Sequence, residues 1–352
     1  MSIKYPSTWH FVDYEKAFDS IQHKAVFEAL KQHSVQEKYI NILKETYNGS
    51  TAQIRTESTS RKIKIMKGVR QGDTLSPVMF TAALEEIFSR MEVEVGININ
   101  GERMNNLRFA DDIILFAEKE EHLSKLLNDL NEEGRKDGMK MNKKKTKIMC
   151  NEIAKKRRGK GISIDGEWLE EVEEYKYLGR LLTPGNEMAR EIDERITSAW
   201  KRFGQYSMFM RDQRMPMCLK RKIMDTVILP AMTYGAETWA LTNHQREKLA
   251  ITQRSMERSM LGVTRRDKIR NEDLRARTKV KDVIEKVNKA KGKWAGHLAR
   301  MKNHEWAKKT TEWTPWDKKR GKGRPKRRWR DDIEQRAGSM WTQRAQDREE
   351  WR

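Results

Sequence analysis

Three aspartates stand at the ends of apolar segments, where a carboxylate is unusual. Asp111 and Asp112 interrupt the run RFADDIILFAE at residues 108–118, and Asp13 ends the segment TWHFVD at residues 8–13. Two adjacent like charges are costly in an apolar setting unless solvent or a cation compensates them. The pair therefore has two interpretations. It is the tip of a β-hairpin, where Asp is a common turn residue, or it is part of a site for a hard cation such as Mg²⁺.

The second interpretation needs a third carboxylate, because one pair of ligands rarely holds a metal ion. Asp13 follows a short apolar segment, so a sheet that brings this segment beside the Asp111–Asp112 hairpin would gather three carboxylates. Carboxylates arranged in this way can hold two metal ions, which clamp the attacking and leaving oxygens of a phosphoryl transfer. The apolar flanks would then fix the carboxylates on a rigid, buried platform.

The elements that would position these carboxylates mix strands and helices over the first 182 residues. Alternating apolar residues and turn residues predict strands or hairpins at 8–13, 52–55, 61–67, 106–110, 113–117, 139–150 and 162–182. Helical spacing predicts helices at 15–32, 36–47, 118–136 and from Ser76–Pro77 onward, with Ser76 as the cap. Because strict βαβ alternation is absent, this order predicts an α+β fold with an antiparallel sheet.

Helical patterns dominate after residue 183, with breaks near Pro216, Pro230–Gly235 and Gly262. The run KKRGKGRPKRRWR at 318–330 contains nine basic residues and no acidic one, which is typical of a flexible arm. We therefore expect three regions. These are an α+β region at 1–182, an all-α domain at 183–270, and a basic helical region at 271–352 that carries the arm.

The strongly basic composition narrows the class of partner. The chain has 73 Lys and Arg against 52 Asp and Glu, a net charge of +21, which indicates a polyanion and first of all nucleic acid. No apolar run reaches the roughly 18 residues of a membrane span, and the N-terminal residues lack a signal-peptide core. Cys150 and Cys218 lack the spacing of a disulfide framework or a zinc site. We expect an intracellular protein, in the nucleus or the cytoplasm, that does not bind a membrane.

Five motifs that follow one another in order resemble the palm motifs of a reverse transcriptase from a non-LTR, LINE-like retrotransposon. They are FVDYEKAFDSI (11–21), GVRQGDTLSPVMF (68–80), RFADDIILFAE (108–118), GMKMNKKKTKIM (138–149) and YKYLGRLL (175–182). The resemblance implies a polymerase palm over residues 1–182, with helices on one face of its antiparallel sheet and partial fingers. An all-α, thumb-like domain and the basic C-terminal region would follow it.

The resemblance also implies catalytic roles. Asp13 and Asp111 match the metal-binding aspartates, and Asp112 matches the second residue of the hairpin pair, with a lesser ligand or electrostatic role. The cofactor would be two Mg²⁺ ions, with Mn²⁺ as a substitute. The partners would be an RNA template, a DNA primer and dNTPs.

Other residues match substrate-binding positions of the family. Phe18 matches the aromatic gate that would clash with a ribose 2′-OH and select dNTPs, although an ordinary core Phe on a helix is the alternative. Arg70, Gln71 and Gly72 match the motif that lies against the incoming nucleotide and the template. The alternative for these three residues is a polar loop before a capped helix.

The last two motifs are less specific. Lys145 and Lys147 lie where the family has a lysine beside the triphosphate, and a solvated basic strand edge is the alternative for each. Tyr177, Leu178 and Gly179 resemble the hairpin that supports the primer 3′ end, or form a plain β-hairpin.

The basic residues of the arm are expected to bind nucleic-acid phosphates in a salt-sensitive way, and a nuclear localisation signal is a second interpretation. These residues are Lys318, Lys319, Arg320, Arg324, Lys326, Arg327 and Arg328.

The chain begins almost at the first palm motif, so we interpret it as an N-terminally truncated copy that lacks upstream fingers segments, with the C-terminus left open. Two functions remain. One is an RNA-directed DNA polymerase that acts by two-metal nucleotidyl transfer, and the other is a catalytically inactive, nucleic-acid-binding remnant. A membrane-surface or scaffold protein would explain the charge but not the ordered motifs, and Phe18 argues against an RNA-templated RNA polymerase. The sequence leaves open the template RNA, the integration target, the oligomeric state and the fold of residues 270–352.

Overall fold

The chain forms two compact units. The computed structural model describes residues 8–55, 59–91, 95–155, 161–185, 187–313 and 327–351. The first unit runs from Ser2 to Leu178 and includes Thr183–Gly185, and the second comprises Gly179–Leu182 and Asn186–Arg352. The domain boundaries expected at residues 182 and 270 stay predictions.

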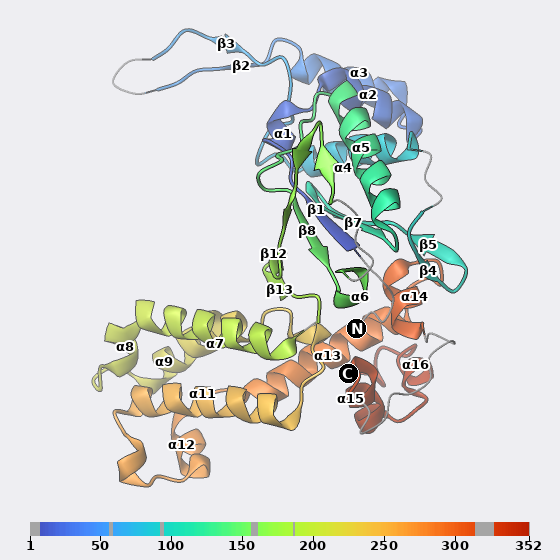
Figure 1. The fold of residues 1–352 in the computed structure, drawn as a ribbon. Helices are drawn as coiled ribbons and strands as arrows, with labels where there is room; N and C mark the ends of the chain where they lie inside the picture. Colours follow the sequence, from blue (N-terminus) through green and yellow to red (C-terminus); the bar gives the residue numbers. More distant parts are fainter. Residues whose placement is uncertain are drawn as a thin grey trace. The chain divides into compact units, whose positions relative to one another are not determined.

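A five-stranded sheet in the order β11-β8-β1-β7-β6 organises the first unit (Figure 1). Its strands are β1 (Thr8–Val12), β6 (Asn106–Phe109), β7 (Asp112–Ala117), β8 (Lys147–Cys150) and β11 (Glu170–Glu171). Strand β1 pairs antiparallel with β7 and β8, and β6 pairs antiparallel with β7. The edge strand β11 joins β8 in parallel. The predicted α+β fold is confirmed, but the parallel edge strand makes the sheet mixed.

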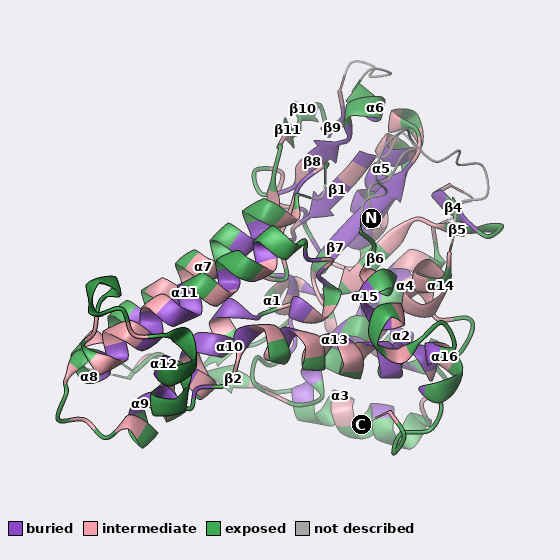
Figure 2. Ribbon diagram, turned by 90° about the horizontal axis from the view of Figure 1, so that it is seen from below, coloured by how far each residue is buried: buried purple, intermediate pink, exposed green. Residues whose placement is uncertain are grey.

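The two central strands are apolar on both faces, which is why they lie inside the sheet. Residues 113–117 of β7 are buried, and so are residues 10–12 of β1 (Figure 2). A strand of this kind cannot turn one face to water. Its ends are therefore the places where a charged side chain is tolerated.

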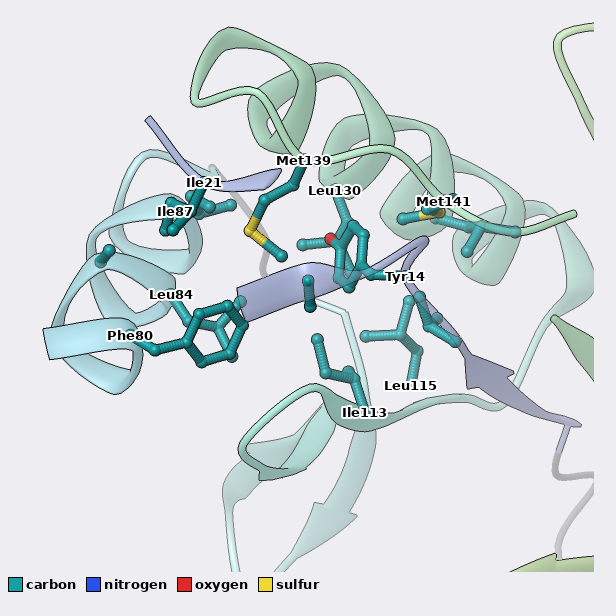
Figure 3. Close-up of a cluster of buried hydrophobic side chains, with 14 of the residues drawn as sticks. Tyr14, Ile21, Phe80, Leu84, Ile87, Ile113, Leu115, Leu130, Met139 and Met141 are labelled. Atoms are coloured by element: carbon teal, nitrogen blue, oxygen red, sulfur yellow. The ribbon is translucent and has the colours of Figure 1, made fainter. Parts of the chain in front are cut away.

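Helices α2 (His23–Gln32), α4 (Ser76–Ser89) and α5 (Glu120–Lys136) cover one face of the sheet. Side chains of these helices and of the strands share one core, in which Phe80, Leu84, Ile113, Leu115 and Leu130 point toward one another (Figure 3). Successive strand residues point to opposite faces, so Ile113 and Leu115 reach this core while Ile114 and Phe116 do not. The expected helices on one face are thus present.

Several predicted elements differ in extent from those observed. The helix expected at 15–32 is divided into α1 (Ala17–Ser20) and α2, because Ile21 has an extended backbone with φ −60° and ψ 137°. Helix α4 begins at Ser76 with Leu75 as its cap residue, so Ser76 is not the cap. The strand expected at 139–150 is limited to β8, since residues 143–145 form a turn.

Short elements complete the first unit. They are α3 (Glu37–Tyr47), β2 (Thr51–Ala52), β3 (Ile63–Lys64), β4 (Ile97–Ile99), β5 (Glu102–Met104), α6 (Glu152–Lys155), β9 (Ser163–Ile164), β10 (Glu167–Trp168) and β12 (Tyr175–Tyr177). Strands β2 and β3, β4 and β5, and β9 and β10 form two-stranded antiparallel pairs.

The second unit is helical in its described residues apart from β13 (Arg180–Leu182). Its α-helices are α7 (Met188–Gln205), α8 (Ser207–Arg211), α9 (Met217–Ile223), α10 (Leu229–Met232), α11 (Asn243–Leu261), α12 (Asn271–Thr278), α13 (Val283–Ala299), α14 (Trp306–Glu312), α15 (Trp329–Ala337) and α16 (Trp341–Arg344). Short turns of other helix types lie at η1 (Met224–Ile228), η2 (Ala236–Thr238) and η3 (Arg265–Asp267). Residues 271–352, whose fold the sequence left open, are therefore helical where they are described.

All three breaks expected in this unit fall at helix ends. Pro216 immediately precedes α9, and Gly262, with φ +68°, ends α11 in the left-handed region that favours glycine. In the break expected at Pro230–Gly235, α10 ends at Met232 and Gly235 has φ +71°, although Pro230 itself lies in the first turn of α10, after the π-helical turn η1. Such a turn accommodates a proline, which has no N–H to donate. No helix of the described residues is long and apolar enough to cross a bilayer.

His10 is a buried titratable group at the centre of the sheet. Its side chain is fully buried in β1, and neither ring nitrogen has a hydrogen-bond partner among the described residues. Burial lowers the pKa of His10 from 6.5 to about 3. Between these two values the unfolded chain binds more protons than the folded one, so stability is full above pH 6.5 and falls as the pH drops toward 3.

We predict that His10→Leu removes this part of the pH dependence. The free energy of unfolding of the wild type should fall between about pH 7 and about pH 4.5 by roughly 3 kcal/mol more than that of the variant, because one pKa unit corresponds to about 1.4 kcal/mol. Urea unfolding at the two pH values measures the difference. The exposed His33 supplies a matched control, His33→Leu, which should keep the wild-type dependence. Equal pH dependence in the wild type and His10→Leu would contradict the assignment.

Candidate active site

The two adjacent aspartates form the tip of a hairpin between β6 and β7. Phe109 pairs with Asp112, so Ala110 and Asp111 are the two loop residues. Ala110 has φ +52°, an unusual value for a residue other than glycine, asparagine or aspartate. The hairpin interpretation of the pair is therefore correct for its local structure. It is compatible with a functional role, because the tight turn exposes both carboxylates at one end of the sheet.

Asp13 lies at the same end of the sheet. The last register pair between β1 and β7 is Val12 with Ile113, so the next residue of each strand toward this end is Asp13 on β1 and Asp112 on β7. The backbone of Asp13 is fixed from the other side, because its N–H donates to Thr146 Oγ1 at 3.3 Å and its carbonyl accepts from Asn142 N at 2.7 Å. The sheet thus gathers the three aspartates that the sequence singled out.

The electrostatics of this edge reflect the crowding of the carboxylates. Burial raises the pKa of Asp13, Lys145 lowers it and Asp111 raises it, and the net effect is upward. Burial, Asp111 and Asp13 all raise the pKa of Asp112. The buried Oδ2 of Asp13 has no hydrogen-bond partner among the described residues, and its ion pair with Lys145 Nζ, at 3.7 Å, is longer than a hydrogen bond. The group therefore carries negative charge that is only partly compensated.

Carboxylate oxygens are ligands that suit Mg²⁺ and other hard cations. The donor chemistry of Asp13, Asp111 and Asp112 therefore fits such an ion, and the uncompensated Oδ2 of Asp13 supports the fit. However, within the described part of the chain no three His, Cys, Asp or Glu side chains are close enough together to hold a metal ion. The assignment of the three aspartates as metal ligands stays a prediction.

The lysines of the KKKTK run have different partners. Lys143 binds Asp165 and Glu167, and Lys147 binds Glu170 at 2.5 Å. Lys145 is exposed and its ammonium lies against Asp13. Of the two lysines considered for a charged substrate, Lys145 is thus the one beside the aspartates, while Lys147 is occupied at the other edge of β8.

Phe18 is half-buried and stacks on Phe80, with ring centroids 4.5 Å apart and an interplanar angle of 16°. Its carbonyl accepts a hydrogen bond from Val69 N at 2.7 Å. The ring packs against the hydrophobic core, so the interpretation as a core Phe describes its contacts. Its predicted role as a gate under the sugar is untested and stays a prediction.

The loop that carries Arg70, Gln71 and Gly72 is tied to two neighbouring elements. The Arg70 guanidinium donates to Thr46 O at 2.9 Å and Ser50 Oγ at 2.7 Å, at the end of α3. Gln71 Nε2 donates to Asp19 Oδ1 at 3.1 Å. Gly72 has φ +87° and open space where a Cβ would lie. The expected substrate-binding role of these residues is untested.

Sequence reasoning missed Gly68, the first glycine of the same motif. Gly68 also has φ +87°, but a Cβ on it would lie 2.7 Å from the carbonyl oxygen of Asp19. Its N–H donates to Ile21 O at 2.7 Å, and its carbonyl contacts His23 Nε2 at 2.9 Å. Gly68 therefore fastens the loop to the segment that follows Asp13. The only sequence signal was a glycine before an apolar residue, which is common.

A second residue that was missed is Tyr175. Its ring stacks on Phe11 at 4.0 Å, and its pKa is raised by burial, by Asp13 and by Asp112. Tyr177, which was predicted, donates from its hydroxyl to the backbone carbonyl of Asp112 at 3.2 Å. Burial and the nearby Asp112 raise the pKa of Tyr177 to about 12. The two tyrosines thus lie beside the aspartates and stay neutral at physiological pH.

Leu178 and Gly179 follow at a turn, with φ values of +48° and +77°. Gly179 belongs to the second unit, where its carbonyl accepts from Arg195. The primer-binding role expected for Tyr177, Leu178 and Gly179 is untested.

Comparison with known proteins decides the family. Residues 3–182 match the family described as reverse transcriptase (RNA-dependent DNA polymerase). The chain belongs to the reverse transcriptase family. The assignment to a reverse transcriptase of a non-LTR retrotransposon, made from the five motifs, is confirmed.

Several relatives of the chain come from mobile elements. A transposon-derived protein of Caenorhabditis elegans is 35% identical over 72% of this chain and 96% of its own length. The Pol polyprotein of the type-1 retrotransposable element R2 of Nasonia vitripennis is 29% identical over 48% of this chain and 17% of its own length. The reverse transcriptase thus spans only a small part of that polyprotein. Among solved structures, a telomerase from Candida tropicalis matches with a TM-score of 0.39 and 12% identity, over 85% of this chain and 48% of its own, which is too weak to carry an argument.

The basic arm of the reverse transcriptase is only partly described. Lys318, Lys319, Arg320, Arg324 and Lys326 lie outside the described residues. Arg327 and Arg328 are described, and Trp329 and Arg330, which were expected to belong to the arm, form the start of α15. Arg327 binds Asp332, and the backbone N–H of Arg328 donates to Asp331. These last residues of the run are therefore ordered against a helix rather than extended as an arm.

The two glycines of the GVRQG loop allow a matched test. We predict that Gly68→Ala destabilises the reverse transcriptase by more than Gly72→Ala. Both substitutions force a side chain into the left-handed region, at a cost of about 1–2 kcal/mol, but only the Cβ at residue 68 also meets the Asp19 backbone. Overpacking adds roughly 1–3 kcal/mol. Urea unfolding of the two variants measures the difference, and equal losses would contradict the close approach of Gly68 to Asp19.

Lys145 should control the protonation of Asp13. We predict that Lys145→Gln raises the pKa of Asp13 further above its ordinary value, because it removes the lysine that lowers this pKa. A cation binds the ionised carboxylate, so the acid limit of cation binding should move to higher pH. Carbon-13 NMR titration of labelled aspartate carboxyls, assigned with Asp13→Asn, measures the shift. Lys147→Gln removes the same charge from a lysine paired with Glu170 and should leave the Asp13 titration unchanged. Equal titrations in both variants and the wild type would refute this role.

Proposed function

We propose that the first unit is the catalytic core of an RNA-directed DNA polymerase, which transfers a nucleotide from a dNTP to the 3′-hydroxyl of a primer. The observation that carries the proposal is the meeting of Asp13 with the Asp111–Asp112 turn at one end of the sheet. The pKa values of Asp13 and Asp112 are raised first by burial and then by neighbouring carboxylates, and both effects support it, because a bound cation would stabilise the ionised carboxylates. Because the chain belongs to the reverse transcriptase family, the reaction proposed for this cation site is nucleotide transfer.

Several residues of the chain would each have a separate role in the transfer. When bound, two Mg²⁺ ions, or Mn²⁺ in their place, would activate the attacking hydroxyl and offset the charge on the leaving pyrophosphate. Asp13 and Asp111 would hold them through carboxylate oxygens, with Asp112 close by. The primer 3′-oxygen bonds to the α-phosphorus while the bond from that phosphorus to the pyrophosphate oxygen breaks. Lys145 would donate a proton or a hydrogen bond to the pyrophosphate as it leaves.

The substrates proposed are dNTPs, an RNA template and a DNA primer. Phe18 is held by its stack on Phe80, and a ring held in place would clash with a ribose 2′-OH and so favour a dNTP. Arg70 has N–H donors beyond those it uses at the end of α3, and the net charge of +21 suits a nucleic-acid duplex. Tyr177, bound to the backbone of Asp112, would couple the primer-binding turn to the aspartates.

One observation favours a second function, that of a catalytically inactive remnant that binds nucleic acid. The described side chains include no group of three metal-ligating residues close enough to hold an ion. A chain that binds a duplex through its positive charge but does not draw the three carboxylates together would have this function.

Primer extension on an RNA template with Mg²⁺ and dNTPs distinguishes the two functions. We predict that the wild-type chain extends the primer and that Asp13→Asn and Asp111→Asn each lower the rate by at least about 1,000-fold, because the ligands of the ions supply several kcal/mol of transition-state stabilisation. Duplex binding, measured in parallel by fluorescence anisotropy, should be unchanged or tighter, since each variant loses a negative charge.

Glu132→Gln is the matched control, because it makes the same carboxylate-to-amide change on the exposed side of α5. It should extend the primer at the wild-type rate. Extension that survives in Asp13→Asn or Asp111→Asn would sink the assignment of these aspartates. Salt-sensitive binding by every chain with extension by none would establish the remnant instead.

A further inference from the structure

A polar pocket lies in the helical unit, and of the residues singled out from the sequence its wall contains only Arg327. Its volume is about 430 Å³, and its wall comes from the start of α11, the residue pair before α15, and α15 itself. It is lined by Asn243, Arg246, Arg327, Asp332, Gln335 and Arg336.

Asp332 is the only acid among the described residues that line the pocket, and its carboxylate already has several cationic partners. Its side chain is buried, with 4% exposed. Arg327 Nε donates to Asp332 Oδ1 at 2.6 Å, and Arg246 donates to Oδ2 at 3.0 Å. The ammonium of Lys291, itself buried beneath the pocket, also binds Oδ2. One carboxylate therefore forms ion pairs with three cations.

Arg336 adds a fourth positive charge without a partner. Arg336 lines the pocket with its side chain exposed to solvent, and within the described part of the chain that side chain forms no hydrogen bond and no ion pair. Burial and the charge of Arg246 lower the pKa of Arg336, and burial also lowers the pKa of Lys291. Both pKa values are lowered first of all by burial, and Asp332 acts in the opposite direction on each of them.

Nearby acids do not supply the missing charge. Glu334 of α15 binds Arg330, and Asp331 accepts from the backbone N–H of Arg328. Asp282, which lines an adjoining hollow together with Arg336, binds Arg254 and Arg275. Glu285 lines the same hollow and forms no ion pair with Arg336. Four cations thus surround one carboxylate, and this excess of three positive charges favours the binding of an anion.

We propose that this pocket binds a phosphate group, supplied by the backbone of a nucleic-acid strand. Guanidinium groups have a fixed fork of donors that matches phosphate oxygens, and Arg336 has all five of its N–H donors available. Gln335 and Asn243 offer further neutral donors at the wall. The proposal does not depend on the aspartates of the first unit, so it can fail or succeed independently of the polymerase.

The basic residues that precede the site in the sequence, and the net charge of the chain, favour nucleic acid over free phosphate as its ligand. The basic run at 318–326 directly precedes Arg327, and the whole chain carries a charge of +21. A nucleic-acid strand that places one phosphate in the pocket carries further phosphates, which the net positive charge of the chain attracts, whereas a free phosphate gains much less from that charge.

The variant that tests the pocket is Arg336→Gln, with Arg330→Gln as its control. Both remove one charge from α15, but Arg330 is bound to Glu334 and does not line the pocket. In the full-length chain, Arg336→Gln should weaken binding of an RNA–DNA duplex by about 5- to 10-fold and lower the log–log salt slope by about 0.9, the value for one phosphate contact. Arg330→Gln should change the affinity less than about 2-fold.

Thermal unfolding separates binding from a purely structural role. Without ligand, Arg336→Gln should melt at the same or a higher temperature than the wild type, because it removes a repulsive charge. Inorganic phosphate in a chloride buffer should raise the melting temperature of the wild type and of Arg330→Gln, but not that of Arg336→Gln.

Three further outcomes have distinct meanings. A phosphate-dependent shift lost in Arg336→Gln, with duplex binding equal to the control, would keep the phosphate site but assign it to a free phosphate or a nucleotide. Equal weakening of duplex binding by both variants, without a phosphate-dependent shift, would overturn the proposal, because the effect would then be one of net charge. A lower melting temperature of ligand-free Arg336→Gln would overturn it as well, since Arg336 would then stabilise the fold.

Discussion

The antiparallel pairing of β1 with β7 is the constraint on which the first unit depends. Both strands are buried on both faces, so their register is fixed by the core that α4 and α5 complete. The same register carries β1 to its end at Val12 and turns the chain back at Ala110 and Asp111. Asp13 and the aspartate pair therefore lie at the same end of the sheet because the hydrophobic side chains beside them pack into one core. A slip of one residue would send Ile113 and Leu115 to the wrong face and separate the carboxylates at the same time.

In the helical unit, other buried charged side chains are neutralised by nearby partners. Glu257 is buried, and Arg254 and the Thr278 hydroxyl both bind it. Lys220 is buried as well, and its ammonium donates to the carbonyl of Met260 at 2.6 Å, near the end of α11, where the helix dipole favours a cation. Each of these groups has partners that match its charge. The group around Asp332 differs, because its cations outnumber the acid that holds them.

Local patterns in the sequence predicted the strands around Asp13 and Asp111 and the helices that cover them, since alternation and helical spacing are properties of neighbouring residues. They did not predict the parallel strand β11, the stacking of Tyr175 on Phe11 or the close approach of Gly68 to Asp19. Each of these joins segments far apart in the chain, and nothing in the residues beside Tyr175 distinguishes it from a solvated strand residue. For the same reason, the sequence did not distinguish the lysines of the KKKTK run from one another. KKKTK contains four nearly equivalent lysines, and only the turn at 143–145 sends Lys145 toward Asp13 and Lys147 toward Glu170.

The two proposed sites have the same electrostatic form with opposite signs. In each, the fold brings like charges together and provides fewer opposite charges than are needed. One side chain in each site lacks a hydrogen-bond partner among the described residues: Asp13, at its buried Oδ2, in one and the exposed Arg336 in the other. In a chain of charge +21 the aspartates are the local exception, and a nucleic-acid strand drawn in by the general charge would be repelled from them unless a cation stood between. Around Arg336 the repulsion is between the protein's own cations, and the strand itself would relieve it. A polyanion and a divalent cation are thus complementary to one charge distribution, since the strand would offset the positive charge around Arg336 and the cation would offset the negative charge of the aspartates.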